Sequence, residues 1–148
     1  MTTLLLTGAA GLVGSRLLPR LVQDGHEVRA LVRRETEMPT GATAVRGDLS
    51  DPDTLRAAVE GVETVVHLAA VFRTQDEDAI WAANADGTRN LITAVQQHAP
   101  NARVIMSSTG NVYNPDATRP AIETDESPRT RPTAPARSSR SSWCATAA

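Results

Sequence analysis

One stretch near the amino end decides the fold: Leu4-Leu5-Leu6-Thr7-Gly8-Ala9-Ala10-Gly11-Leu12-Val13-Gly14. Three leucines lead directly into glycines that recur at every third position, and an apolar helical pattern follows. A glycine turn between a strand and a helix is typical of a phosphate site, because the helix N-terminus presents unpaired N–H groups and a partial positive charge. We expect Gly8 to allow the tight turn, Gly11 to let a pyrophosphate approach the backbone, and Gly14 to let the helix pack against its strand.

Apolar segments of strand length alternate with segments of helical period from this stretch onward. The strand segments are nearly continuous in Val, Leu and Ile, which is typical of strands buried on both faces. Such alternation predicts an α/β fold, a Rossmann-like, incomplete doubly wound parallel sheet of about five strands with helices on both faces. The expected strands are Thr3–Thr7, Glu27–Val32, Thr43–Arg46, Thr64–Leu68 and Arg103–Ser107.

Three helices are expected between these strands. Gly25 is a stop signal for the first helix, and Pro19 inside it removes a backbone hydrogen bond and should bend it. Ser50 or Asp51 can cap a short second helix. The third is longer and ends near His98. The side chains expected to face inward are Val13, Leu17, Leu18, Leu21 and Val22 in the first helix, Leu55, Ala58 and Val59 in the second, and Trp81, Asn84, Thr88, Leu91, Ile92 and Val95 in the third.

Composition limits what the chain can do. A net charge of −2 over 148 residues gives no basis for a nucleic-acid or membrane-surface partner. All 15 basic residues are arginines, which excludes Schiff-base and general-base lysines. The three histidines form no metal-ligand pattern with other side chains: His67 is expected to be a packed strand residue, and His26 and His98 lie at element ends as surface residues.

The sequence carries no targeting signal that we recognise. The amino end lacks the basic leading segment of a signal peptide, and its apolar stretch is broken by Gly8 and Gly11. No apolar run approaches the ~20 residues needed to span a bilayer. The single cysteine, Cys144, cannot form an internal disulfide, so a reducing compartment is the default. We therefore expect a cytoplasmic protein.

Five motifs in order and at matching spacing make the chain resemble the extended short-chain dehydrogenases/reductases, which include NAD(P)-dependent epimerases, dehydratases and reductases. The resemblance runs from Thr2 to about Pro135. The motifs are Thr7-Gly8-x-x-Gly11-x-x-Gly14, Gly47-Asp48-Leu49, His67-Leu68-Ala69-Ala70, Asn84-x-x-Gly87-Thr88-x-Asn90-Leu91 and Ser107-Ser108-Thr109-x-x-Val112-Tyr113.

The resemblance implies a dinucleotide cofactor, NADP or NAD. Arg33 lies just past the second strand, where an adenosine ribose would arrive, and no acid stands there to bind a 2′-hydroxyl. Arg33, with Arg34 as a second candidate, could pair with a 2′-phosphate and so favours NADP slightly; a solvated arginine pair is the alternative. In the family the acid at Asp48 contacts the adenine amino group; a helix-entry or turn residue is the alternative for Asp48. The expected cofactor-binding residues are Gly8, Ala10, Gly11, Leu12, Val13, Gly14, Arg33, Asp48, Leu49, Ala69, Ala70 and Asn84.

Catalytic roles are implied for two residues. Asn84 would support the proton relay of the active site, or would be a core amide with satisfied partners. Thr109 falls where the family places a Ser or Thr that hydrogen-bonds the reacting oxygen, or it is a loop threonine. The family also needs a Tyr with a Lys four residues later, and our alignment places Ala136 and Arg140 at those positions. The proton-transferring pair is therefore absent.

The carboxyl end departs from the family. We divide the chain into an NAD(P)-binding part at 1–113, a loop at 114–135 that continues the resemblance, and an atypical tail at 136–148, which we expect to be disordered. An abrupt change of composition near Pro135 suggests a shifted reading frame and a truncated enzyme. Without a following strand, the edge at 103–107 would be bare, which predicts marginal stability and self-association.

Two functional hypotheses follow from these observations. The first is a cofactor-binding fragment of an epimerase, dehydratase or reductase, whose parent reaction is hydride transfer at a carbinol or carbonyl carbon of a sugar or other small molecule. The second is a non-catalytic module that senses a dinucleotide. A minimal active reductase with another acid is a third and weaker alternative, because nothing with a suitable pKa accompanies Thr109 and Asn84.

Overall fold

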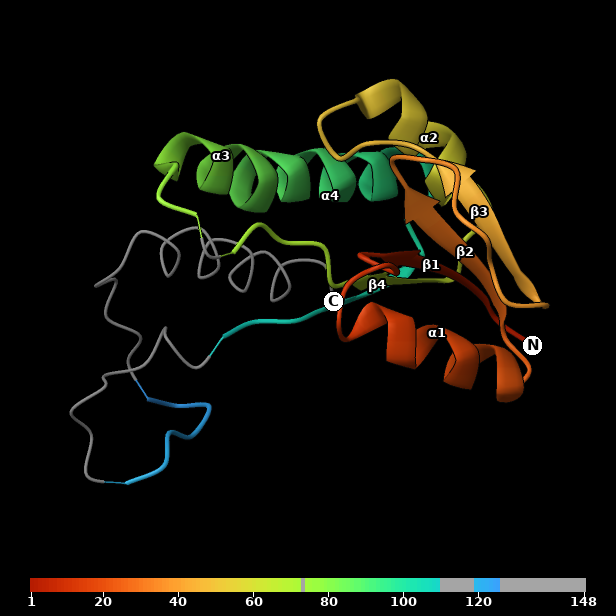
Figure 1. Cartoon of the computed structure of the whole chain (residues 1–148), viewed down its shortest axis with the longest axis horizontal. Coiled ribbons are helices and arrows are strands. Elements are labelled where there is room, and N and C mark those ends of the chain that lie inside the picture. Colours follow the sequence, from red (N-terminus) through yellow and green to blue (C-terminus); the bar gives the residue numbers. More distant parts are fainter. Residues whose placement is uncertain (73, 110–118, 126–148) are drawn as a thin grey trace.

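The structure, a computed structural model, describes residues 1–72, 74–109 and 119–125 of the chain. Five strands within these ranges form one parallel sheet in the order β3-β2-β1-β4-β5 (Figure 1). The predicted doubly wound sheet is therefore confirmed, and the three bounds that differ from the expected ones do so by one residue. The strands are β1 (Thr3–Thr7), β2 (Glu27–Val32), β3 (Ala42–Arg46), β4 (Thr64–His67) and β5 (Arg103–Met106).

The first strand lies at the centre of the sheet. Thr7 at the end of β1 is in register with Leu31 of β2 on one side and with His67 of β4 on the other. The chain runs from β1 outward through β2 and β3, and then returns to β1's other side to form β4 and β5. The strand order thus reverses at β1, and crevices at the carboxyl ends of such strands are the usual ligand sites of open α/β sheets.

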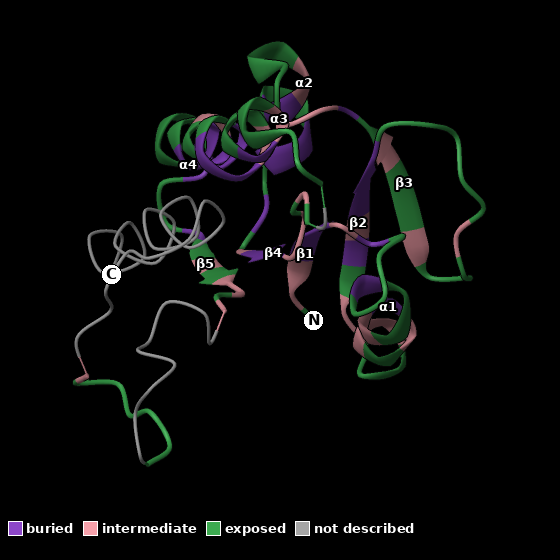
Figure 2. Cartoon of the chain, turned by 60° about the vertical axis from the view of Figure 1, so that its left-hand side comes forward, coloured by how far each residue is buried: buried purple, intermediate pink, exposed green. Residues whose placement is uncertain are grey.

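Helices cover both faces of the sheet, as predicted (Figures 1 and 2). Alternate residues of β1 belong to the cores on opposite faces. On one face Leu4 and Leu6 pack with Leu18 of α1 (Gly14–Gln23). On the other face Leu5 packs with Leu55 of α2 (Pro52–Val59) and with α4 (Gly87–His98). Both faces are apolar because parallel strands linked by helical crossovers are buried on both sides.

The first helix begins one residue later than its apolar stripe suggested. Val13 is the residue before α1 and is 62% exposed, so its predicted place in the inward stripe is wrong. The reason is that the chain is still leaving the turn there, and Gly14 is the first residue to pack inward. Gly25 has the predicted role: with φ +82° it follows the helix, and its N–H donates to the Val22 carbonyl at 3.0 Å. Pro19 lies inside α1, which continues to Gln23.

The predicted long third helix is three consecutive segments. These are α3 (Glu77–Trp81), a π-helical segment η1 (Ala82–Asp86), and α4. The wider π turn rotates the residues before it relative to α4, so Trp81 is 39% exposed instead of facing inward. Asn84 and Thr88 are buried as expected. The second helix is capped by Asp51, whose carboxylate accepts from the Asp53 N–H at 3.1 Å.

The remaining described segment, residues 119–125, contains turns but neither helix nor strand, as predicted for this part of the chain. Residues 110–118 and 126–148 lie outside the described residues, and with them Ala136, Arg140, Cys144 and the predicted disordered tail. Among the described residues β5 pairs with β4 alone, and Ile105 on it is 49% exposed. Self-association through this edge stays a prediction. In the part that the structure describes, no helix is both long enough and apolar enough to span a bilayer.

Candidate functional site

Backbone contacts close the turn after β1. The Gly11 N–H donates to the Gly8 carbonyl at 2.9 Å, and Gly8 has φ +75°. A Cβ added at Gly14 would lie 2.1 Å from the Gly8 carbonyl oxygen, so only glycine lets α1 begin against this turn. A Cβ at Gly11 would meet the same oxygen at 3.2 Å and no other atom within 4 Å. The free space at Gly11 is therefore on the solvent side, where a ligand would lie.

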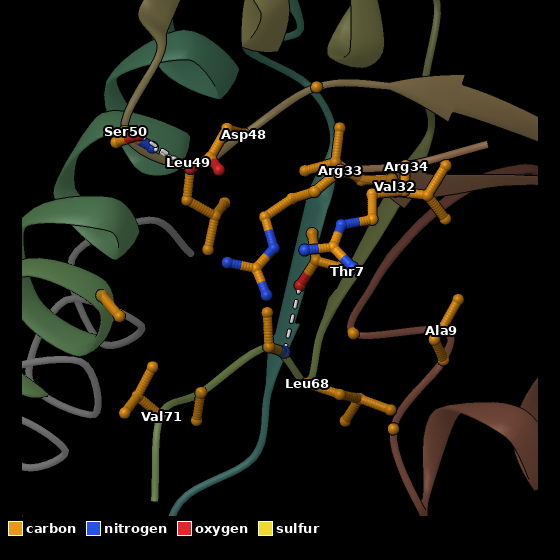
Figure 3. Close-up of a pocket in the computed structure, with 18 of the residues that line it drawn as sticks. Thr7, Ala9, Val32, Arg33, Arg34, Asp48, Leu49, Ser50, Leu68 and Val71 are labelled. Atoms are coloured by element: carbon orange, nitrogen blue, oxygen red, sulfur yellow. Dashed lines mark hydrogen bonds between the residues drawn. The ribbon is translucent and has the colours of Figure 1, made fainter. Parts of the chain in front are cut away.

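The turn also presses against the loop that follows β4. A Cβ at Gly8 would lie 2.7 Å from the Ala69 nitrogen, so the two backbones are in direct contact. The Ala69 N–H donates to the Thr7 hydroxyl at 3.2 Å, which ties this loop to the end of β1 (Figure 3). Further along the loop, the Asn84 side chain exchanges two 2.8 Å hydrogen bonds with the backbone of Val71.

A cavity of about 850 Å³ opens where the carboxyl ends of these strands meet. Its size is within the range of small-molecule and cofactor sites, about 300–1,000 Å³. Figure 3 shows its residues converging from the turn after β1, the end of β2, the loop after β3 and the loop after β4. The lining residues are Thr7, Gly8, Ala9, Ala10, Gly11, Leu31, Val32, Arg33, Arg34, Thr36, Gly47, Asp48, Leu49, Ser50, Leu68, Ala69, Ala70, Val71, Ala79, Ala82 and Ala83.

Charged side chains come from one side of this cavity. Arg33 and Arg34 follow β2, and both guanidinium groups extend into the hollow in Figure 3. Asp48 follows β3, and its Oδ1 accepts from the Ser50 N–H at 2.9 Å and from the Ser50 hydroxyl at 2.8 Å. These two hydrogen bonds hold the pKa of Asp48 below its ordinary value; partial burial opposes them, and the charge of Arg33 adds to them. Asp48 is thus an anion that also serves as a turn residue.

Most of the predicted cofactor-binding residues meet in this one cavity. Those that line it are Gly8, Ala10, Gly11, Arg33, Asp48, Leu49, Ala69 and Ala70. Leu12, Val13 and Gly14 adjoin Gly11 without lining the cavity. Among the described residues, the backbone N–H groups of Leu12 and Val13 have no acceptor, so they remain available to an anion beside Gly11.

The two predicted catalytic residues do not reach the cavity wall. Asn84 is fully buried in η1, with both ends of its amide engaged by Val71. Thr109 is half-buried beyond β5 and is not a lining residue. His67 is fully buried in β4, as predicted for a packed strand residue, and it bonds with Thr7 and Thr88. Within the described ranges, no group of three or more His, Cys, Asp or Glu side chains could hold a metal ion.

Sequence reasoning missed part of the lining. Ser50 holds Asp48, and Thr36 closes the side near the arginines; both lie in loops without a regular pattern. Ala79, Ala82 and Ala83 face the cavity from α3 and η1, where small side chains leave space. The other lining residues that were missed lie at the carboxyl end of a strand or in the turn or loop that follows it. Their place in the chain could have identified them, because the carboxyl ends of neighbouring parallel strands meet at one edge of the sheet. The residues of this kind are Thr7, Ala9, Leu31, Val32, Gly47, Leu68 and Val71.

The sequence is similar to those of known proteins. Residues 4–139 match the sequence profile of the NAD dependent epimerase/dehydratase family. The chain is 33% identical over 118 residues to a 3 beta-hydroxysteroid dehydrogenase/Delta 5-->4-isomerase from Mycobacterium tuberculosis; the match covers 73% of this chain and 32% of that protein. It is 34% identical over 142 residues to a UDP-glucose 4-epimerase from Streptomyces lividans, covering 88% and 42%.

The fold matches solved structures as well. A short-chain dehydrogenase/reductase superfamily protein from Agrobacterium tumefaciens, crystallised with bound NAD, aligns with a TM-score of 0.82 at 31% identity. The alignment covers 95% of this chain and 43% of that protein. The chain therefore spans less than half the length of each of these three relatives.

Proposed function

The chain belongs to the NAD dependent epimerase/dehydratase family, and from that premise we propose that it binds NAD or NADP in the cavity beside the glycine turn. One observation carries the proposal: the cavity at the end of β1 is bounded by a turn that only glycines allow, with space left open at Gly11. A dinucleotide pyrophosphate needs such an approach to the backbone at a helix N-terminus. NAD bound to the similar short-chain dehydrogenase/reductase structure supports the same ligand.

Each wall of the cavity has a role in this proposal. The backbone N–H groups of Leu12 and Val13 bind the pyrophosphate, together with the start of α1. Asp48 and Leu49 lie beside the adenine, and Ala69 and Ala70 allow the cofactor to pass close to the loop after β4. The guanidinium groups of Arg33 and Arg34 bind a 2′-phosphate, so NADP is preferred slightly over NAD.

The bound cofactor supplies hydride chemistry, and the parent reaction that we propose is hydride transfer at a carbinol or carbonyl carbon of a sugar or related small molecule. The similarity to a UDP-glucose 4-epimerase supports a sugar substrate. In this proposal Thr109 hydrogen-bonds the substrate oxygen and Asn84 supports the proton relay. Proton transfer in this family needs the Tyr and Lys that Ala136 and Arg140 replace in our alignment, so the 148-residue chain binds cofactor without turnover.

The test is calorimetric titration of the purified 148-residue protein with NAD⁺ and with NADP⁺. We expect saturable binding at one site for each, with the higher affinity for NADP⁺. A parallel assay with UDP-glucose follows the absorbance of reduced nicotinamide, which reports net oxidation, and the consumption of UDP-glucose by chromatography, which also reports epimerisation; we expect no turnover in either. Absence of heat with both dinucleotides would refute cofactor binding, whereas steady turnover would refute only the proposed inactivity.

A non-catalytic sensing module is the second candidate, and the same substitutions at positions 136 and 140 favour it. The two candidates differ in what binding does to the protein. A sensor couples the cofactor to a structural change, so the oxidised and reduced forms should protect different amides in hydrogen exchange. A fragment of an enzyme should show the same protected amides, around the cavity, with both forms.

A further inference from the structure

The buried polar side chains of the described residues are Thr7, His67, Asn84 and Thr88, each at most 2% exposed. Hydrogen bonds between side chains link Thr7, His67 and Thr88, and the Thr88 hydroxyl extends this chain to the backbone carbonyl of Asn84. The His67 ring lies between the two threonines, with Nδ1 2.6 Å from the Thr7 hydroxyl and Nε2 3.0 Å from the Thr88 hydroxyl. Buried polar groups are costly unless they are paired, so this chain is a specific feature of an otherwise apolar interior.

The direction of each hydrogen bond follows from its neighbours. The Thr88 hydroxyl donates to the Asn84 carbonyl at 2.9 Å, so it accepts from an Nε2–H of His67. In a neutral imidazole the other nitrogen, Nδ1, is then an acceptor, and the Thr7 hydroxyl donates to it. The Thr7 oxygen in turn accepts the Ala69 N–H at 3.2 Å. One ring therefore orients both hydroxyl groups.

Both ends of this chain hold the same irregular loop. At one end Thr7 binds the N–H of Ala69; at the other, Asn84 binds the N–H and the carbonyl of Val71. Ala69 and Val71 line the cavity, and they lie beyond the last residue of β4. The Thr7 and Asn84 side chains thus hold the loop at two points, and His67 connects these points through Thr88 and the Asn84 carbonyl.

We propose that His67 is a positioning residue for dinucleotide binding, acting through Thr7 and Thr88 on the loop from Ala69 to Val71. The inference rests on the proposed cofactor site. The position of this loop matters for the site because Gly8 and Ala69 are in contact: a Cβ at Gly8 would be 2.7 Å from the Ala69 nitrogen. A small shift of Ala69 therefore changes the width of the gap between this loop and the glycine turn.

The His67 ring makes hydrogen bonds to Thr7 and to Thr88, and different substitutions remove one or the other. In His67→Asn the side-chain oxygen lies near the place of Nδ1 and can still accept from Thr7. In His67→Gln the terminal amide reaches the place of Nε2 and can donate to Thr88 only. Because Thr7 holds the loop residue that touches the glycine turn, we expect His67→Asn to retain NAD⁺ affinity within about threefold and His67→Gln to lose about tenfold.

Two threonines on α4, Thr88 and Thr93, provide a test variant and a matched control for the hydrogen bond between His67 and Thr88. Thr88 and Thr93 each donate to the carbonyl four residues before them at 2.9 Å, but Thr93 is exposed and lies outside the cavity. Thr88→Val removes the bond to the Asn84 carbonyl as well as the bond to His67, so we expect it to weaken NAD⁺ binding about fivefold, more than His67→Asn. We expect Thr88→Ser to restore binding and Thr93→Val to leave it unchanged. Recovery with serine separates hydrogen bonding from packing.

The experiment is calorimetric titration of the full 148-residue chain and these variants with NAD⁺, below the thermal transition of every variant. The amide proton shift of Ala69 in NMR spectra reports the Thr7 contact independently of affinity, and it should move in His67→Gln and remain in His67→Asn. If the wild-type chain binds no dinucleotide, the proposed function fails and this inference falls with it. If the wild type binds and both His67→Gln and Thr88→Val match it within twofold, the proposed function stands and the positioning role is overturned.

Discussion

The two sides of the cavity are built in different ways. The side formed by Gly8, Gly11 and Gly14 consists of backbone; contacts at Gly8 and Gly14 are too close for a side chain, and Gly11 leaves space for a ligand. The side formed by Arg33 and Asp48 consists of charged side chains that reach in from loops. The difference indicates a division of roles: the glycine side recognises what all dinucleotides share, and the charged side distinguishes among them.

Gly14→Ala should have the largest effect, and on the fold itself. The added Cβ would lie 2.1 Å from the Gly8 carbonyl oxygen and 2.8 Å from the Ala9 Cα, so α1 or the turn must move. We expect the free energy of unfolding in urea to fall by about 3 kcal/mol. Gly25→Ala is the control, because it has no neighbour within 4 Å and is limited to the backbone strain of its positive φ. Equal stability of the Gly14→Ala and wild-type proteins would contradict the close-packed turn.

Gly11→Ala should separate binding from folding on the same side. Its Cβ meets one backbone oxygen at 3.2 Å and otherwise projects toward the open cavity. We expect the stability to change by less than about 1 kcal/mol, while NAD⁺ affinity falls at least about thirtyfold because the pyrophosphate is kept from the backbone. Calorimetry and urea unfolding on one preparation measure both quantities. Unchanged affinity would place the pyrophosphate elsewhere.

Arg33→Ala tests whether the charged side of the cavity distinguishes NADP⁺ from NAD⁺. Loss of a guanidinium that pairs with a phosphate should weaken NADP⁺ binding about tenfold and leave NAD⁺ binding within twofold. Arg56→Ala on the exposed side of α2 removes the same charge away from the cavity and serves as control. Equal losses for both cofactors, or none, would remove the 2′-phosphate role from Arg33.

Asp48→Asn should have the smallest effect, and one that depends on pH. The pKa of Asp48 is lowered in the folded protein, chiefly by the Ser50 hydrogen bonds. The carboxylate therefore contributes stability that is fully present above the unfolded-state pKa of about 3.9 and is lost as pH falls through the lower folded-state pKa. The melting temperature of Asp48→Asn should be slightly below that of the wild type at neutral pH and should converge with it in acid. Glu35→Gln, at an exposed site, controls for net charge.

The sequence predicts the glycine side better than the charged side, for a physical reason. Close backbone approach admits only glycine, so its spacing is visible in the chain, and continuous apolar runs reveal buried strands. Asp48 was open to two interpretations because a hydrogen bond to Ser50 depends on how a loop folds. The π-helical segment η1 inside the third helix is also invisible to periodicity; it contains Asn84, whose side chain bonds the backbone of Val71, a residue distant in sequence.

The most direct test of the central claim maps the ligand onto the backbone. NAD⁺ is titrated into the isotope-labelled 148-residue chain, and the amide shifts of the described residues are followed by NMR. We predict that the largest changes fall on Gly8 to Val13 and on Ala69 to Val71, the two segments that meet at the end of β1. Changes confined to other segments, or no change at saturating NAD⁺, would contradict the claim that this turn and this loop together bind the cofactor.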